Sequence, residues 1–231
     1  AADYGRAQRR RRVFFFVFRN DTKWGKRLHT KYEATLPTDV DLDTRLACYT
    51  PYIFQDGLFA RQFTVKGEAV KKRINANKLD DDIAEVSANF SDGKMWNSGL
   101  MTNGYYYTIE TEPKGDEEPI PMKEIVVSHD QVPEEYYIDG EKSEKFKYLR
   151  GPKKITRTAA NGHTYTFSEG GMSEYDSLDL PGRTMLTSEG SVNRSTHLLK
   201  INGKYRLITP IEAERLQDFP DDWTRYKRNA K

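Results

Sequence analysis

The sequence has very little cysteine and no long apolar run, and both shortages exclude classes of protein. Cys48 is the one cysteine among 231 residues. An intramolecular disulfide is therefore impossible, which suits a reducing cytoplasm. One cysteine and four histidines cannot supply a zinc site either. No apolar stretch approaches membrane-spanning length and no signal peptide is visible, so we expect no membrane partner.

An excess of charge of one sign is also missing. The chain has 37 Lys and Arg residues against 35 Asp and Glu residues, a formal net charge of +2. Overall charge thus favours no class of partner, and a nucleic-acid signal must come from local clusters. Aromatic residues make up 12% of the chain, which argues against disorder. The length allows one large domain or two small ones.

The densest positive charge lies against the most hydrophobic segment, in AQRRRRVFFFVFRND (7–21). Residues 13–18 are β-branched or aromatic and predict a buried strand. If the strand extends backward, Gln8, Arg10 and Arg12 share one of its faces. Two interpretations follow. Residue chemistry alone favours a solvated charge run beside a buried strand; the other interpretation is a functional Gln-x-Arg-x-Arg row that leads into a core strand.

Local patterns predict several elements further along the chain. LFARQFTV (58–65) is typical of a strand. The pair Asn103-Gly104 between apolar stretches indicates a β-hairpin. The acidic, proline-containing stretch 112–121 is expected to be an exposed loop, and 120–128 a short helix.

The clearest helix signal is TPIEAERLQDFP (209–220). Thr209 can cap the helix, Pro210 suits its first position, and Glu212 completes a capping box. Pro220 is expected to end the helix.

A basic, aromatic and glycine-rich segment, FKYLRGPKKITRTAANGHTYTFSEGG, occupies residues 146–171. We predict a turn-rich loop there. Its composition is typical of a chain that follows a phosphate backbone, and equally of a plain surface loop.

Three segments in order resemble the C-terminal half of DNA cytosine-5 methyltransferases. DYGRAQRRRRVFFFVFRND (3–21) resembles that family's Gln-x-Arg-x-Arg motif and its following strand. PGRTMLTSEGSVNRSTH (181–197) is similar to motif IX, and YRLITPIEAERLQDFPDDW (205–223) to the segment after it, with Ile208 in place of the usual Leu. The variable region between the first two is where the family keeps its target recognition domain.

Features of the family's N-terminal half are missing from the chain. These are a Gly-containing loop for S-adenosyl-L-methionine, a Pro-Cys nucleophile and a Glu-Asn-Val motif. Cys48 lies in Leu-Ala-Cys-Tyr, so we reject it as the nucleophile. The closing motif X is also missing, and Ala1 is not an initiator Met. We therefore expect a chain cut at both ends or one half of a split enzyme. Such a chain would be inactive without an N-terminal catalytic half that binds S-adenosyl-L-methionine.

The resemblance implies an α+β fold. It would be a mostly β recognition domain with short helices, attached to the last strand region of a Rossmann-like α/β methyltransferase domain that is otherwise absent. Residues 1–20 would end the catalytic domain, 21–204 would form the recognition domain including motif IX, and 205–231 would return to the catalytic domain.

The implied function is the target-recognition half of a DNA (cytosine-5-)-methyltransferase. It would bind double-stranded DNA sequence-specifically and support the pocket that receives a flipped cytosine. The setting would be the cytoplasm of a prokaryote or phage-infected cell, in restriction–modification or phage self-protection. The alternative is a non-catalytic DNA-binding or regulatory module derived from the family.

The resemblance places Gln8, Arg10 and Arg12 beside the reacting base, with Arg12 nearest. Motif IX residues mainly organise the recognition domain, with some near DNA; His197 is interpreted as structural. The motif IX residues carried over are Arg183, Thr184, Thr187, Glu189, Arg194 and His197.

Base readout is expected in the loops before motif IX, because Arg suits guanine and Asn suits adenine in the major groove. The predicted phosphate anchors and base readers are Arg150, Lys153, Lys154, Arg157, Asn161, His163, Thr164 and Thr166. The competing location for readout is 90–112, around the Asn103-Gly104 hairpin.

Overall fold

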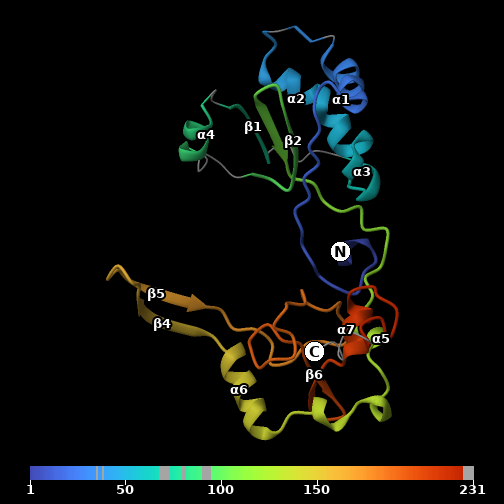
Figure 1. Ribbon diagram of the computed structural model, residues 1–231, viewed down its shortest axis with the longest axis vertical. Helices are drawn as coiled ribbons and strands as arrows, with labels where there is room; N and C mark the ends of the chain where they lie inside the picture. The colour runs from blue at the N-terminus through green and yellow to red at the C-terminus, as the bar shows by residue number, and fades with distance from the viewer. Residues whose placement is uncertain (35, 38, 68–72, 80–81, 90–94, 226–231) are drawn as a thin grey trace. The chain divides into compact units, whose positions relative to one another are not determined.

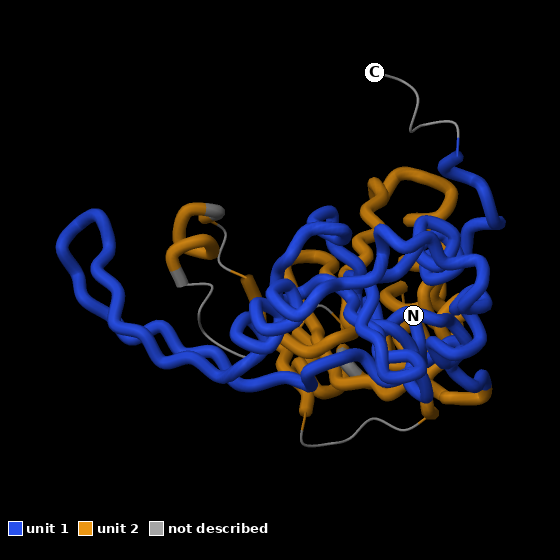
Figure 2. The backbone as a smooth tube through the Cα atoms, turned by 90° about the horizontal axis from the view of Figure 1, so that it is seen from below, with its two compact units in different colours: residues 1–12, 117–231 blue, residues 13–116 orange. Residues whose placement is uncertain are grey.

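The chain forms two compact units. In the computed structural model, one unit comprises Ala1–Arg12 with Glu117–Lys231, and the other comprises Val13–Asp116 (Figure 2). We call them unit 1 and unit 2. Within the part of the chain that the structure describes, no helix is both long and apolar enough to cross a membrane. The described residues are 1–34, 36–37, 39–67, 73–79, 82–89 and 95–225.

Unit 2 packs helices against a small antiparallel sheet (Figure 1). The strand order is β1-β3-β2. The helices are α1 (Lys23–Leu28), α2 (Leu42–Pro51), α3 (Leu58–Gln62) and α4 (Ile83–Asn89), and the strands are β1 (Ile74–Lys78), β2 (Ser98–Thr102) and β3 (Tyr105–Ile109). Its core is aromatic: Tyr32, Tyr49 and Tyr107 are buried together.

The predicted hairpin at Asn103-Gly104 is confirmed. It joins β2 to β3, and both turn residues have positive φ, 49° and 77°. This is the backbone that a two-residue hairpin turn requires and that Asn and Gly tolerate best. The strand predicted at 58–65 is wrong, because Leu58–Gln62 is the helix α3. A short run of apolar residues does not distinguish the two.

Unit 1 contains three helices and two β-hairpins among its described residues. They are α5 (Met122–Ile125), α6 (Gly140–Arg150), α7 (Pro210–Leu216), the hairpin β4 (Lys153–Thr158) with β5 (Thr164–Glu169), and the hairpin β6 (Leu198–Ile201) with β7 (Lys204–Leu207). Short 3-10 turns lie at Ala2–Tyr4, His129–Gln131 and Glu134–Tyr136. The predicted short helix in 120–128 is confirmed as α5, and the exposed stretch at 114–119 agrees with the predicted loop. The buried core consists of Ala7, Met122, Ile125, Leu199, Ile208 and Leu216.

Helix α7 begins as the sequence predicts. The Thr209 hydroxyl accepts from the Glu212 amide, and the Glu212 carboxylate accepts from the Thr209 amide, which is a complete capping box. The helix ends at Leu216, before Pro220. Asp218 adopts a left-handed backbone with φ 61°, which closes the helix without the proline.

The buried strand predicted at 13–18 is wrong for this chain. No residue of that stretch is in a strand, and the side chains of residues 13–17 are exposed, Phe15 by 84% and Val17 by 88%. Strand propensity expresses how well a side chain packs on a sheet. Among the described residues no strand pairs with this segment, so its side chains have no sheet to pack on. The small antiparallel sheets and short helices agree with the α+β class.

Candidate nucleic-acid interface

The segment that carries the arginine run lies against the motif IX segment and α7. Gln8 forms a parallel bridge with Gly182. The Arg9 amide donates to the Gly182 carbonyl and the Gly182 amide to the Ala7 carbonyl, each at 2.7 Å. The Gln8 side-chain amide donates to the Leu216 carbonyl at 3.3 Å. Three stretches far apart in sequence thus meet in one place.

Gly182 is the point of closest approach at this junction. A Cβ at that position would lie 2.6 Å from Leu216 Cδ1 and 2.9 Å from Met122 Sδ. A larger residue at this position would therefore require the ends of the Leu216 and Met122 side chains to shift. Two residues on, the Thr184 hydroxyl donates to the Arg9 carbonyl at 2.8 Å. Thr184 therefore holds the base of the arginine run and is not free to donate that proton to DNA.

The arginine run itself does not form a single-faced row. Gln8 is buried, Arg10 is half-buried and Arg12 is exposed. The bridge ends before Arg10, and Arg12 donates to the Arg11 carbonyl at 2.6 Å. The expected alternation required a strand that continues through residue 12, and none forms there.

Arg150, predicted to contact phosphate, is instead a core residue that is 1% exposed. Its guanidinium donates to the Asp176 carboxylate at 2.8 Å and to the Thr196 carbonyl at 2.7 Å. Arg183 donates to the same carboxylate at 2.5 Å and to Thr196 at 3.1 Å. Both arginines therefore serve the fold, and we do not carry Arg150 into the proposed interface.

Asp176 balances these two cations. Burial alone would raise the pKa of Asp176, but the hydrogen bond from Arg183 and the charge of Arg150 outweigh it and hold the pKa below its usual range. The Leu198 amide also donates to this carboxylate at 2.9 Å. Burial lowers the pKa of Arg150, against the opposing effect of Asp176.

A second set of contacts fixes the segments on either side of the β4–β5 hairpin. Arg194 donates to the carbonyls of Leu149 at 3.0 Å and of Gly151 at 3.3 Å, and also to the carbonyl of Gly170. Lys153 donates to Leu149 at 2.8 Å. Lys153 and Arg194 are thus anchors of the hairpin base. The Lys153 side chain is also largely covered, and contact of either residue with DNA stays a prediction.

Glu189 organises the rest of motif IX. Its carboxylate accepts from the His197 amide at 2.6 Å and lies 3.0 Å from His197 Nδ1. His197 is fully buried, and its Nε2 has no hydrogen-bond partner among the described residues. Thr187, two residues before Glu189, is exposed. The contacts of Glu189 and His197 serve the loop's own structure.

The turn-rich loop predicted at 146–171 is wrong in form. Helix α6 ends at Arg150, and the rest is the antiparallel hairpin β4–β5 with Lys153 opposite Glu169 and Thr158 opposite Thr164. Figures 1 and 2 both show the hairpin extending away from the rest of unit 1. The predicted readers therefore occupy an ordered ribbon.

The remaining predicted DNA-contacting residues lie on this ribbon and are exposed. They are Lys154, Arg157, Asn161, His163, Thr164 and Thr166. At the tip, Gly162 has φ 81°, and the Asn161 side chain accepts from the His163 amide at 3.1 Å. The Arg157 guanidinium lies 4.0 Å from the centre of the Phe167 ring. The ribbon is thus held at its base and exposed to solvent. Its two exposed cations, Lys154 and Arg157, have no ion-pair partner among the described residues. Such an element can engage phosphates and base edges of a duplex.

Comparison with known proteins identifies relatives along nearly the whole chain. The model of the family described as C-5 cytosine-specific DNA methylase matches residues 1–230. The Type II methyltransferase M.Sau3AI of Staphylococcus aureus is 49% identical over 224 residues, which is 97% of this chain and 50% of that protein. The chain thus spans about half the length of the curated relative it matches. No solved structure matches.

Proposed function

The chain belongs to the C-5 cytosine-specific DNA methylase family, and from this premise we propose that it is the DNA-recognition half of a DNA (cytosine-5-)-methyltransferase. The observation that carries the proposal is the exposed β4–β5 hairpin, fixed at its base by the buried Arg150 and the half-buried Arg194, in a chain that matches the family over residues 1–230. A restriction–modification setting fits the type II relative.

In this proposal residues 21–204 recognise the target, and residues 1–20 and 205–231 belong with the catalytic domain; of the last range, 226–231 lie outside the described residues. The residues proposed to contact DNA are Thr187 and, on the hairpin, Lys154, Arg157, Asn161, His163, Thr164 and Thr166. Gln8, Arg10 and Arg12 lie beside the flipped cytosine, where charged donors stabilise the ring that the catalytic cysteine attacks. The alternative, a non-catalytic DNA-binding or regulatory module, is not favoured by a match to a methyltransferase over 97% of the chain.

Members of this family use S-adenosyl-L-methionine as the methyl donor. Cofactors of that size bind beyond the carboxyl ends of parallel strands, next to a glycine-containing loop. Strands β1 to β7 pair only in antiparallel fashion, the parallel bridge at Gln8 and Gly182 is a single residue pair, and the Gln8 side-chain amide donates to the Leu216 carbonyl. These residues do not fit the cofactor, so we assign its binding to the other half and derive no step through it.

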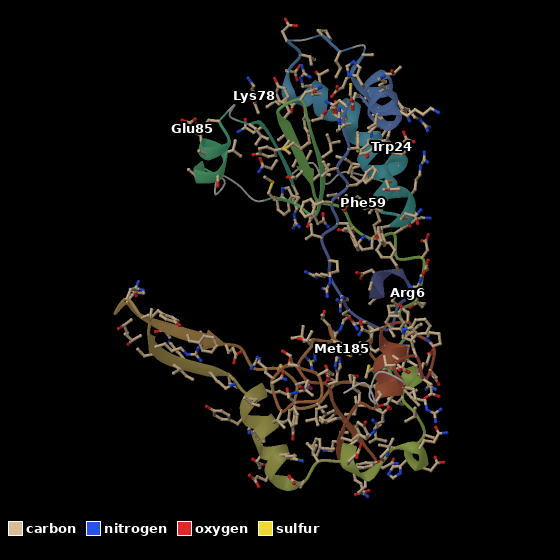
Figure 3. The ribbon with its side chains drawn as sticks, viewed as in Figure 1. Arg6, Trp24, Phe59, Lys78, Glu85 and Met185 are labelled. Carbon is tan, nitrogen blue, oxygen red and sulfur yellow. The ribbon has the colours of Figure 1, made fainter. Side chains whose placement is uncertain are left out.

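The other half is also the proposed cover for the apolar segment 13–17. The Phe14 ring lies 6.0 Å from the Phe59 ring of α3 in a tilted arrangement, and it stacks on Phe63, just after α3, with ring centres 5.6 Å apart. All three rings remain exposed (Figure 3 labels Phe59). Apolar patches of this kind mark surfaces that another chain or segment covers.

We expect the isolated chain to bind duplex DNA but neither to hold S-adenosyl-L-methionine nor to transfer its methyl group. Calorimetry tests whether the chain binds the cofactor, and transfer of a tritium-labelled methyl group to duplex DNA tests whether it is active. Adding the part of the Staphylococcus aureus relative that the match leaves uncovered should restore transfer, with that part alone as the control. Micromolar cofactor binding or turnover by the isolated chain would contradict the proposal.

In the enzyme assembled from both parts, Arg12→Ala should slow the single-turnover reaction, because a donor to the reacting base is lost. The expected increase in activation free energy is about 2–4 kcal/mol. Duplex affinity should change less, since other basic residues share it. Arg11→Ala is the matched control, since Arg11 is an exposed neighbour. Equal losses in rate and affinity for Arg12→Ala would reduce that residue to a phosphate anchor.

A further inference from the structure

The β4–β5 hairpin has two faces of different chemistry. Side chains alternate along each strand, and the register places cross-strand partners on the same face. One face, which we call the aromatic face, carries Lys153, Ile155, Arg157, Tyr165, Phe167 and Glu169. The other, which we call the threonine face, carries Lys154, Thr156, Thr158, Thr164, Thr166 and Ser168.

Several side chains on the aromatic face contact one another or neighbouring residues of unit 1. Arg157 lies over the Phe167 ring, and Lys153 lies 5.1 Å from the centre of the Tyr148 ring while it donates to Leu149. Tyr165 is stacked with His163 of the tip, with ring centres 6.5 Å apart and planes 10° apart. The rings, the Lys153 ammonium and the Glu169 carboxylate of this face are therefore already in contact with other groups of unit 1.

Groups on the threonine face have no such partners. The four threonines form two directly opposed pairs, Thr156 with Thr166 and Thr158 with Thr164. All four are exposed, and none makes a side-chain hydrogen bond to another described residue. The face carries no carboxylate, and its one charge is Lys154. Five hydroxyls, counting that of Ser168, four threonine methyl groups and one cation therefore share this face.

We infer that the threonine face is the surface that reads base edges in the major groove of the target duplex, an assignment that rests on the proposed function. A two-stranded ribbon is one of the elements that the major groove admits. When such a ribbon lies in the groove, one face meets the base edges and the other faces outward. The threonine face suits the inner position because its donors and acceptors are free and its only charge is positive.

The assignment adds Thr156 and Thr158 to the residues that determine specificity and moves Arg157 to the outward face. A threonine can contact a base in two ways, by its hydroxyl to a donor or acceptor and by its methyl group to the methyl of thymine. Thr→Val removes the hydroxyl and keeps the shape, and Thr→Ser removes the methyl group. Both replacements are compatible with a solvated strand.

The experiment selects preferred sites from duplexes with a randomised centre, using the 231-residue chain. Wild type, Thr156→Val and Thr166→Val are compared with Arg157→Gln and Tyr165→Phe, which change polar groups on the aromatic face. We expect each threonine replacement to weaken binding to the wild-type site roughly 5- to 150-fold and to alter the bases enriched there. The aromatic-face variants should enrich the wild-type site, with Arg157→Gln weakening all duplexes alike. Far-UV circular dichroism confirms that each variant is folded.

The outcomes separate this inference from the proposed function. If Arg157→Gln or Tyr165→Phe shifts the enriched site while both threonine variants keep it, the aromatic face reads the bases and the inference is wrong. If wild type binds duplexes but neither face affects the site, readout lies elsewhere, and the 90–112 region becomes the better location. If wild type enriches no site at all, the proposed function itself falls.

Discussion

Glu212→Ala should destabilise the chain by about 3–5 kcal/mol, because it leaves a buried guanidinium without its carboxylate. Arg206 and Glu212 are both essentially buried, and the two side chains meet through bonds of 2.6 and 2.7 Å. The carboxylate also accepts from the amides of Val127 at 2.9 Å and Thr209 at 2.7 Å. One side chain thus joins α7, β7 and the segment after α5. Urea unfolding followed by circular dichroism measures the loss.

A matched control separates the buried pair from the helix-end charge. Glu141 lies in the first turn of α6, as Glu212 lies in the first turn of α7, but Glu141 is exposed. Glu141→Ala should change stability by no more than about 0.5 kcal/mol. The double variant Arg206→Ala, Glu212→Ala should cost less than the sum of the single variants, because neither charge is left alone. Strict additivity would show that the two side chains do not act as a pair.

The sequence predicted those elements whose cause is local. The capping box at 209–212 and the Asn103-Gly104 turn are each complete within a few residues, so no tertiary contact is needed to specify them. The β4–β5 hairpin was missed although its signal is of the same kind. Asn161-Gly162 lies between two β-prone runs, but the basic, aromatic and glycine-rich composition of the segment favoured a loop.

The sequence could not predict which arginines are buried. Arg150 and Lys154 look alike in a basic stretch, yet one is 1% exposed and the other lies in solvent. The difference is made by Asp176, 26 residues further along, which the fold brings to Arg150. The strand predicted at 13–18 is wrong for a related reason. Its composition suits a strand, but a strand also needs a neighbour, and composition does not say whether one is present.

Asp176→Asn should be the second severe substitution, with a cost of about 3–5 kcal/mol at neutral pH. Arg150 and Arg183 both direct their guanidiniums at this carboxylate, and asparagine would leave the buried Arg150 and the half-buried Arg183 without a counter-charge. Because Arg150 ends α6 immediately before the hairpin, the loss should also loosen the hairpin base. Amide hydrogen exchange at Met172, whose N–H donates to the Arg150 carbonyl at 2.9 Å, should become faster.

The pH dependence distinguishes a lost charge from lost packing. The pKa of Asp176 is lower in the folded chain than in the unfolded chain, where it is about 3.9. Its contribution is therefore complete above the unfolded pKa and is lost as the pH falls through the folded pKa. The difference in unfolding free energy between wild type and Asp176→Asn should be constant near neutrality and shrink below about pH 4, while other carboxylates cancel in the comparison. A difference that stays constant into acid would assign the cost to packing, because protonation of Asp176 would then leave wild type as stable as before.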